Sequence, residues 1–457
     1  MRQAYHLESV ALKQIGVFDD ARLDFPSIQT ERKDAAKAEI HLFTGPNGCG
    51  KSTLLYALAE VFDKYSTGSL IRRRFRGAES SVDFVFANKA GHYGVRKPDL
   101  QPTACMGNQF GDFQEIYIDL SIGIFFGYGE GHKADLSKYK LSAQQFKPSN
   151  NHSQTDFPFA AFAYSGQRTL RDIKFQAIQQ IDNSPFEAAL SFEGSARPQV
   201  LLQWIANNRA QSALAKADGE DNAAKTYDQA LEKITNLIRE VCDLDLEFRL
   251  ERSPLAVVAR LNGESIHFDG LPDGLKSIIS WVADLALRLE AIPWKMPGEV
   301  FSQPIILFLD EVDIHLHPKW QRRILPAIQK LLPNAQIFVS THSPFVVGSV
   351  EDAWVYRLPE GGHTSGKIEA IPSGAGKSYR LILEEVFGTE GEFDVETEAL
   401  FADFYQLREK FLKTPSQPDT LLQAARKLEE RGNEAALIVG SELRQISRIT
   451  GQELHLA

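Results

Sequence analysis

The nine residues GPNGCGKST, at positions 45–53, constrain the fold of this chain more than any other feature. They fit the pattern GxxxxGK[ST]. They stand between a stretch over 39–44 that is typical of a strand and apolar residues at helical spacing over 54–61. In this context the glycines let successive backbone N–H groups wrap a phosphate, and the start of the helix adds positive potential. The sequence therefore predicts an α/β fold with a phosphate-binding loop after a strand; a glycine-rich structural turn is the alternative.

The polar residues of this loop have expected roles. Lys51 is expected to reach the β- and γ-phosphates of a nucleotide, and Ser52 to offer its hydroxyl to Mg²⁺. The candidate nucleotide-binding residues are Gly45, Asn47, Gly48, Gly50, Lys51, Ser52 and Thr53. A similar string, GAGKS over 374–378, has Ile371 where the leading glycine should stand, so we expect only a loop and a helix start there.

Two adjacent carboxylates, Asp310 and Glu311, end the apolar string PIILFLDE. A strand that is apolar throughout is typical of a central parallel strand covered on both faces. Its carboxyl end would open at the same sheet edge as the phosphate loop. Asp310 is then expected to hold Mg²⁺ through water, and Glu311 to orient or deprotonate the attacking water. The alternative is an acidic pair in a solvated turn.

Histidines follow these carboxylates in two places. His342, in STHSP after the next expected strand, is a candidate for a hydrogen bond to the γ-phosphate, although a lone histidine at a strand end is usually structural. His315 and His317 form an HxH string without a carboxylate or cysteine at ligand spacing. Because Pro318 is typical of a first helical residue, we expect these two histidines to have a structural or dimer-contact role rather than to bind metal.

Composition excludes several classes of protein. With 43% apolar and 24% charged residues and no apolar run of about 20 residues, the chain is expected to be soluble without a membrane span. The start MRQAYHLESV has no signal pattern, which predicts a cytoplasmic location. The three cysteines lack disulfide or zinc spacing. A net charge of −10 disfavours an extended nucleic-acid surface, but the basic run RRRFR over 72–76 leaves a local patch open.

Five motifs in order resemble the ABC-type ATPases of the Rad50, SMC and RecF group, and most of all the overcoming-lysogenization-defect-like ATPases. They are the N-terminal strand, GPNGCGKST, LPDGLKS, FLDEVDIHLHP and STHSP, and they cover residues 1–350. The resemblance implies an ABC-type ATPase head with a mixed or parallel central sheet. It also implies ATP and Mg²⁺ as cofactors, hydrolysis to ADP and phosphate, and a homodimer or higher homo-oligomer that closes around ATP.

On this resemblance the chain has four parts. Residues 1–165 are an ATPase lobe with the phosphate loop, 166–243 a helical insertion, 244–373 a second ATPase lobe, and 374–457 a C-terminal helical lobe. The helical pattern starts near Leu170 and runs to about Cys242. After it, Asn262-Gly263 predicts a two-residue hairpin, since this dipeptide tolerates positive φ angles.

The string LPDGLKS resembles the ABC signature, which in the family contacts the ATP of the opposite subunit. The candidate residues are Asp273, Gly274 and Lys276. Pro272 stands where the family usually has serine, so a hydroxyl and an N–H are missing and slow hydrolysis is expected. In FAYSGQRTL, where the family places its Q-loop, Gln167 is a candidate both for binding Mg²⁺ and for sensing the attacking water; a glutamine in a glycine turn is the alternative.

The modest helical insertion and the C-terminal lobe resemble ATPases of antiphage systems such as Septu, PARIS and retrons. The resemblance implies a sensor or scaffold that controls a partner nuclease encoded nearby, of HNH or Toprim type. After STHSP no Glu followed by an Asp-x-Asp string appears, so a nuclease within this chain is not expected. Two alternatives stay open: a RecF- or Rad50-like repair ATPase that acts directly on DNA, and a slow or non-hydrolysing structural clamp.

Overall fold

The computed structural model describes the larger part of the chain. The described residues are 5–28, 37–62, 70–87, 89–95, 104–106, 114–116, 124–126, 157–166, 177–192, 195–253, 255–296, 298–373, 377–388, 391, 393–414 and 418–454. The chain divides into two compact units, Met1–Phe387 (unit 1) and Gly388–Ala457 (unit 2). The division falls after Phe387 rather than at residue 374. The reason is that α8 (Tyr379–Ile382) and a π-helical turn (Leu383–Phe387) contribute Ile382 and Val386 to the core of unit 1.

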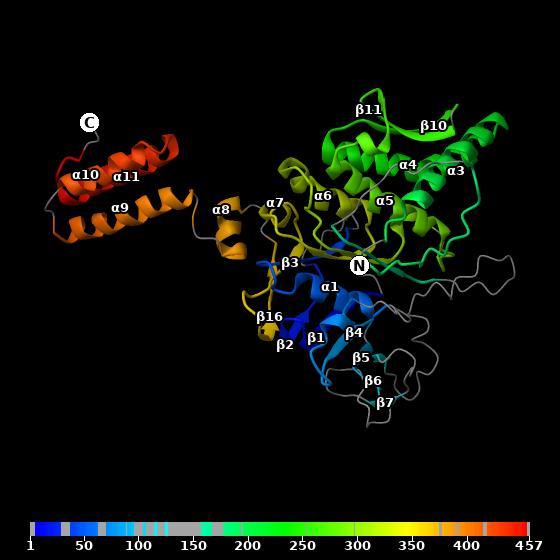
Figure 1. Ribbon diagram of the computed structural model, residues 1–457, viewed down its shortest axis with the longest axis horizontal. Helices are drawn as coiled ribbons and strands as arrows, with labels where there is room; N and C mark the ends of the chain where they lie inside the picture. The colour runs from blue at the N-terminus through cyan, green and yellow to red at the C-terminus, as the bar shows by residue number, and fades with distance from the viewer. Residues whose placement is uncertain are drawn as a thin grey trace. The chain divides into compact units, whose positions relative to one another are not determined.

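A largely parallel sheet forms the centre of unit 1 (Figure 1). Its order is β17-β15-β3-β14-β13-β9, and only β15 and β17 pair antiparallel. The strands are β3 (Glu39–Thr44), β9 (Ala160–Tyr164), β13 (Ile305–Leu309), β14 (Ala335–Ser340), β15 (Ala353–Arg357) and β17 (Ala370–Pro372). Every residue of β3, β9, β13 and β14 is buried, as expected of parallel strands that are covered on both faces.

A second sheet, mostly antiparallel, packs into the same core in the order β16-β2-β1-β4-β5-β8. Its strands are β1 (Leu7–Ile15), β2 (Phe18–Asp24), β4 (Ser81–Phe86), β5 (Lys89–Val95), β8 (Ile124–Phe126) and β16 (Thr364–Ile368); β6 (Ala104–Met106) pairs separately with β7 (Gln114–Ile116). β2 was not predicted from the sequence. The turn between β1 and β2 packs on the phosphate loop, because a Cβ added at Gly50 would lie 2.6 Å from Val17 and 2.8 Å from Phe18.

Helices cover the central sheet and form the insertion. In unit 1 they include α1 (Lys51–Glu60), α3 (Pro198–Ala217), α4 (Asp221–Cys242), α5 (Asp273–Ala291), α6 (Pro318–Leu331) and α7 (Pro344–Val347). α4 packs on α3, α5 and α6. Helix was expected from about residue 170, but the described residues 177–192 and 195–197 contain none. Pro185 disfavours a helix there. Backbone carbonyls of this segment instead accept hydrogen bonds from the Arg288 side chain.

The hairpin predicted at Asn262-Gly263 is confirmed. These two residues have φ of 50° and 95° and join β11 (Leu255–Leu261) to β12 (Glu264–Ile266), and β10 (Leu246–Arg252) completes a three-stranded sheet. α6 begins at Pro318, as expected. The ring Nδ1 of His317 accepts the Lys319 N–H at 3.2 Å, so this histidine caps the helix.

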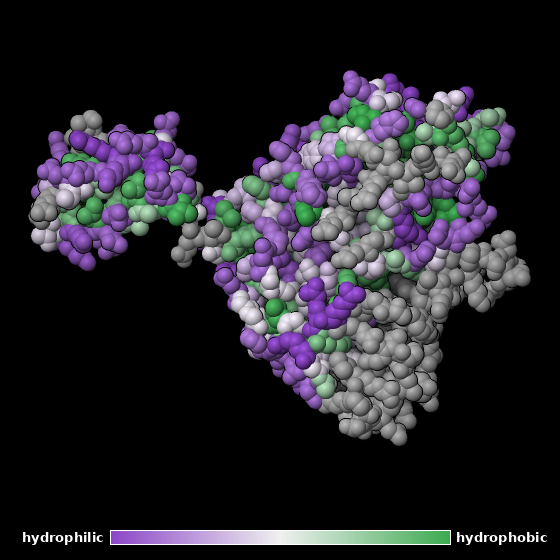
Figure 2. Space-filling view, in the orientation of Figure 1, coloured by the Kyte–Doolittle hydropathy of each residue, from purple (hydrophilic) through white to green (hydrophobic). Residues whose placement is uncertain are grey.

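Unit 2 is a bundle of α9 (Val395–Lys413), α10 (Pro418–Glu429) and α11 (Asn433–Thr450). Its own apolar core contains Phe401, Phe404, Leu421, Val439 and Leu443, among others. Its visible face in Figure 2 is mainly hydrophilic, with apolar side chains scattered among the polar ones. None of the helices in the described parts of the chain combines the length and apolar character of a membrane span.

Candidate nucleotide-binding site

Four parallel strands bring the predicted motifs to one edge of the central sheet. β3 leads into the phosphate loop, β14 into His342, β13 into Asp310 and Glu311, and β9 into Gly166. Parallel neighbours end at the same edge, so these motifs lie side by side in the order β3, β14, β13, β9. The end of β9 is also bonded to the residue that follows β13, because the Asp310 N–H donates to the carbonyl of Tyr164 at 2.9 Å.

The phosphate loop needs glycine at defined positions. Gly45, Gly48 and Gly50 have φ of 144°, 81° and 97°, values that other residues rarely adopt. A Cβ at Gly45 would lie 2.6 Å from the carbonyl oxygen of Leu358, whereas a Cβ at Gly48 would meet nothing within 4 Å. The loop is therefore closely packed at its ends and open at Gly48, where we expect the phosphates to approach the backbone.

The side chain of Lys51 is buried within the loop. Its Nζ donates to the carbonyls of Gly45 at 2.8 Å and Pro46 at 2.9 Å, and it lies 3.6 Å from the Sγ of buried Cys49. These acceptors are weak substitutes for a triphosphate, because a charged acceptor forms the stronger hydrogen bond. We therefore expect the Lys51 ammonium to leave these carbonyls and bind the phosphates when a nucleotide is present.

Ser340 bonds both Asp310 and Glu311, the two residues that follow β13. Its hydroxyl donates to Oδ1 of buried Asp310 and accepts the Glu311 N–H at 2.7 Å. Ser340 was not identified as a site residue from the sequence, although it is the first residue of STHSP and the last of β14. The hydrogen bonds fix one carboxylate oxygen of Asp310 and the backbone of Glu311.

Glu311 is held in a backbone conformation that is unusual for its residue type. Its φ is 49°, in the left-handed region, which costs a non-glycine residue about 1–2 kcal/mol. Gly166 packs so closely that an added Cβ would lie 2.8 Å from the Cβ of Glu311. The hydrogen bond to Ser340 and the contact with Gly166 therefore fix the backbone and Cβ of Glu311.

The pKa of His342 is shifted by charged groups of the phosphate loop and of the acidic segment after β13. Partial burial lowers the pKa of His342 most, the Lys51 ammonium lowers this pKa further, and the carboxylates of Asp313 and Asp310 act in the opposite direction. The charge on Lys51 and the charges on the two carboxylates after β13 therefore all act on His342, which follows β14. The lowered pKa keeps the imidazole of the nucleotide-free protein neutral at pH 7.

Replacing Lys51 by alanine is expected to raise the pKa of His342, because it removes a cation that lowers this pKa. The midpoint can be read from the imidazole signals in NMR spectra of protein with labelled histidine, assigned with His342→Asn. Lys330→Ala, which removes a lysine paired with Glu240 on the surface, is the matched control and should leave the midpoint unchanged. A midpoint that stays or falls in Lys51→Ala would show that the two groups are not neighbours.

The LPDGLKS string forms the start of α5. Pro272 is its N-cap, Asp273 is 75% exposed, and the Lys276 ammonium lies 2.8 Å from the Asp273 carboxylate. This ion pair lowers the pKa of Asp273 through the hydrogen bond from Lys276. Gly274 is required by its own chain as well, since a Cβ there would lie 2.6 Å from the carbonyl oxygen of His315. Substituting Gly274 would therefore disturb the subunit itself.

Thr53 lies differently from the other predicted residues of the phosphate loop. The Thr53 hydroxyl accepts the Nη1 of Arg74 at 2.8 Å, so Thr53 faces the basic run rather than the loop opening. Arg74 also lies over the ring of Tyr56, at 4.9 Å. Gln167 lies outside the described residues. The run RRRFR thus contacts the chain itself at Arg74, and also at Arg76, which bonds to Asp19.

The oxygens of Ser52 and Asp310 fit a site for Mg²⁺. Mg²⁺ prefers oxygen ligands and is usually held by one or two protein groups, substrate phosphates and water. Asp310 supplies a buried carboxylate at the sheet edge, and Ser52 supplies a hydroxyl in the first turn of α1. Among the described residues there is no cluster of three or more His, Cys, Asp or Glu able to hold a metal alone. The donor set therefore fits a metal that arrives with a nucleotide.

Two family models match the chain. The family described as AAA domain, putative AbiEii toxin, Type IV TA system matches residues 114–348, just over half of the chain. A second, described as AAA domain, matches residues 5–76, which include the phosphate loop.

Curated relatives cover most of the chain. The Retron Ec83 probable ATPase of Escherichia coli is 32% identical over 395 residues, 77% of this chain and 72% of its own. The Retron Vc95 probable ATPase of Vibrio cholerae is 24% identical, covering 77% and 74% of the two chains. Septu protein PtuA of Bacillus thuringiensis is 28% identical, covering 83% and 89%.

Among solved structures, the SMC head domain from Thermotoga maritima aligns with a TM-score of 0.39 at 14% identity, covering 82% of this chain and all of that one. The recombination mediator RecF aligns with a TM-score of 0.38 at 13% identity, covering 81% and 99%.

The phosphate loop and the acidic strand end lie at one edge of the parallel sheet, and the matching family models describe an AAA domain. The chain belongs to the family described as AAA domain, putative AbiEii toxin, Type IV TA system, and it is an ATPase that hydrolyses ATP.

Proposed function

We propose that two copies of this chain close around two molecules of ATP and Mg²⁺. In each composite site one chain supplies the phosphate loop, Asp310, Glu311 and His342, and the other supplies the start of α5. The sheet order that brings Lys51, His342 and the β13 carboxylates to one edge carries the proposal. The exposure of Asp273 supports it, since the α5 terminus is open to a second chain.

Pro272 shapes the chemistry of this composite site. A serine at that position would offer a hydroxyl and an N–H to the γ-phosphate, and proline offers neither. The first-turn N–H groups of α5 have no partners within the helix and would face the phosphate instead. Turnover is therefore slow, and bound ATP acts mainly to hold the two subunits together.

The biological role we propose is antiphage defence. The similarity to the retron probable ATPases and to Septu protein PtuA supports this role. In it the ATP-bound dimer is a sensor or scaffold that controls a nuclease encoded nearby. Copurification of the chain with the products of its neighbouring genes, with and without ATP, tests this. A nuclease that is retained and inhibited or activated with ATP supports the role, whereas tight, salt-sensitive duplex binding by the chain alone would favour a repair ATPase.

Asp273→Arg is expected to abolish ATP-dependent dimerisation while leaving ATP binding by the monomer within about twofold, because the longer side chain would occupy the proposed contact with the partner's nucleotide, whereas within its own chain the exposed Asp273 pairs with Lys276. Light scattering with ATP and Mg²⁺ measures the mass, and calorimetry the affinity. Asp221→Arg, at the exposed first turn of α4, is the matched control and should dimerise normally. If Asp273→Arg dimerises as well as the control, the α5 terminus is not part of the interface.

A further inference from the structure

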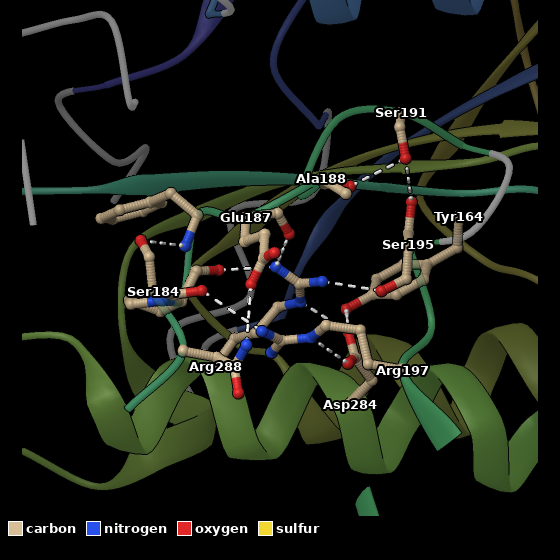
Figure 3. Close-up of polar contacts among 12 residues, drawn as sticks. Tyr164, Ser184, Glu187, Ala188, Ser191, Ser195, Arg197, Asp284 and Arg288 are labelled. Atoms are coloured by element: carbon tan, nitrogen blue, oxygen red, sulfur yellow. Dashed lines mark hydrogen bonds and ion pairs between the residues drawn. The ribbon is translucent and has the colours of Figure 1, made fainter. Parts of the chain in front are cut away.

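A buried cluster of charges surrounds Asp284, three turns along α5 from the LPDGLKS end (Figure 3). Its carboxylate is 1% exposed. Oδ2 accepts the Tyr164 hydroxyl at 2.9 Å and the Nε of Arg288 at 2.5 Å, and Oδ1 accepts the Nε of Arg197 at 3.2 Å. One carboxylate thus joins α5, strand β9 and the residue that precedes α3.

Arg288 fixes the segment between β9 and α3 to α5. Its guanidinium is fully buried and also donates to the carbonyls of Pro185 at 2.6 Å, Glu187 at 2.9 Å and Ser195 at 2.7 Å. A buried ion with this many partners is rigid, because removing any partner leaves charge unsatisfied. Asp284 is consequently tied through its hydrogen bonds to β9 and to the residue before α3.

Tyr164 connects this cluster to the catalytic edge. It is the last residue of β9, and while its hydroxyl bonds Asp284, its carbonyl accepts the N–H of Asp310 at 2.9 Å. Two residues later, Gly166 packs against Glu311. Burial raises the pKa of Tyr164 well above its usual value, so the hydroxyl remains a proton donor at neutral pH.

α5 itself spans the distance between the two ends of this connection. Eleven residues separate Asp273 from Asp284, which corresponds to about 16 Å along a helix. Nearly all residues of α5 after Asp273 are buried, so the helix moves as one body if it moves at all. A contact that displaces Asp273 would therefore also displace Asp284. The hydrogen bond between Asp284 and Tyr164 would pass this displacement to the end of β9.

We propose that Tyr164 and Asp284 are positioning residues that couple the LPDGLKS end of α5 to the Asp310–Glu311 pair of the same chain. The inference rests on the proposed function. When α5 of one subunit closes over the partner's ATP, the Asp284–Tyr164 bond sets the ends of β9 and β13, and with them the catalytic carboxylates of that subunit. Each subunit then hydrolyses its own ATP faster while its α5 is closed over the ATP of the other, which makes turnover cooperative in ATP.

The test is Tyr164→Phe, which removes one hydroxyl and keeps the ring that lies beside Trp281. The expected result is an Mg²⁺-ATP affinity of the monomer within about twofold of the original and a kcat lower by about tenfold, with a Hill coefficient near 1. A defect of folding alone would lower the active fraction without changing the Hill coefficient.

Tyr93→Phe is the matched control. The Tyr93 hydroxyl is also buried and donates to the carbonyl of Ala57, a residue of α1 rather than α5, at 2.6 Å. It should lose similar stability and keep its cooperativity. The proposal is overturned if Tyr164→Phe behaves like Tyr93→Phe, or if the unaltered protein dimerises with ATP yet shows a Hill coefficient of 1. Failure of the unaltered protein to dimerise would instead refute the proposed function.

Discussion

Glu311→Gln is expected to lower the ATP turnover number by about a hundredfold or more and to trap an ATP-bound dimer. The amide keeps the shape of the side chain but cannot take a proton from water, and general bases typically contribute 10²–10⁴-fold. The backbone of Glu311 is fixed by Ser340 and Gly166, so a neutral replacement keeps its place. Phosphate release measures turnover, and light scattering after gel filtration in ATP and Mg²⁺ measures the trapped dimer.

Glu430→Gln is the control for this variant. It makes the same chemical change at an exposed site of unit 2 and should leave turnover and mass unaltered. Unchanged turnover in Glu311→Gln would support the alternative of a clamp whose residual hydrolysis does not use this carboxylate. Lost turnover without a trapped dimer would keep Glu311 as the base and contradict the proposed role of ATP in joining subunits.

Lys51→Ala is expected to weaken Mg²⁺-ATP binding by about a hundredfold or more, because each charge-assisted bond to phosphate is among the strongest hydrogen bonds in proteins. In the absence of nucleotide the ammonium bonds two carbonyls and the Cys49 sulfur, all within its own loop, so the unfolding temperature should change little. Calorimetric titration gives the affinity, and a thermal scan without ATP gives the stability.

Lys330→Ala serves again as the matched control, since Lys330 pairs with Glu240 on the surface and neither is a predicted site residue. ATP binding by Lys51→Ala at the original affinity would mean that the phosphate loop does not hold the nucleotide. A large loss of stability without ATP would show that Lys51 is mainly structural.

The parts of the fold that the sequence predicts well are local. GPNGCGKST specifies its own strand-loop-helix context, the apolar string before Asp310 is long enough to identify a buried strand, and Asn262-Gly263 determines its hairpin by φ preference alone. In each case the residues that set the structure are neighbours in the chain.

What the sequence did not reveal depends on distant partners. Ser340 and Tyr164 gain their positions only through bonds to Asp310 and Asp284, and no local pattern marks these pairs. Helix was also expected from about residue 170, but the described residues 177–192 contain turns instead. Carbonyls of these turns accept hydrogen bonds from Arg288, which is about a hundred positions later in the chain. Tertiary contacts outweighed local preference at these sites.

Mixing two inactive variants tests most directly whether one active site is built from two chains. Lys51→Ala cannot hold ATP, and Asp273→Arg cannot close over a partner's ATP, so neither should hydrolyse ATP alone. In a mixed dimer one of the two sites has both halves intact. An equal mixture is therefore expected to recover a measurable part of the original turnover, at most about half, because only mixed pairs can close and each has one intact site of two. A mixture that stays as inactive as its components, although mixed dimers form, would contradict the shared site.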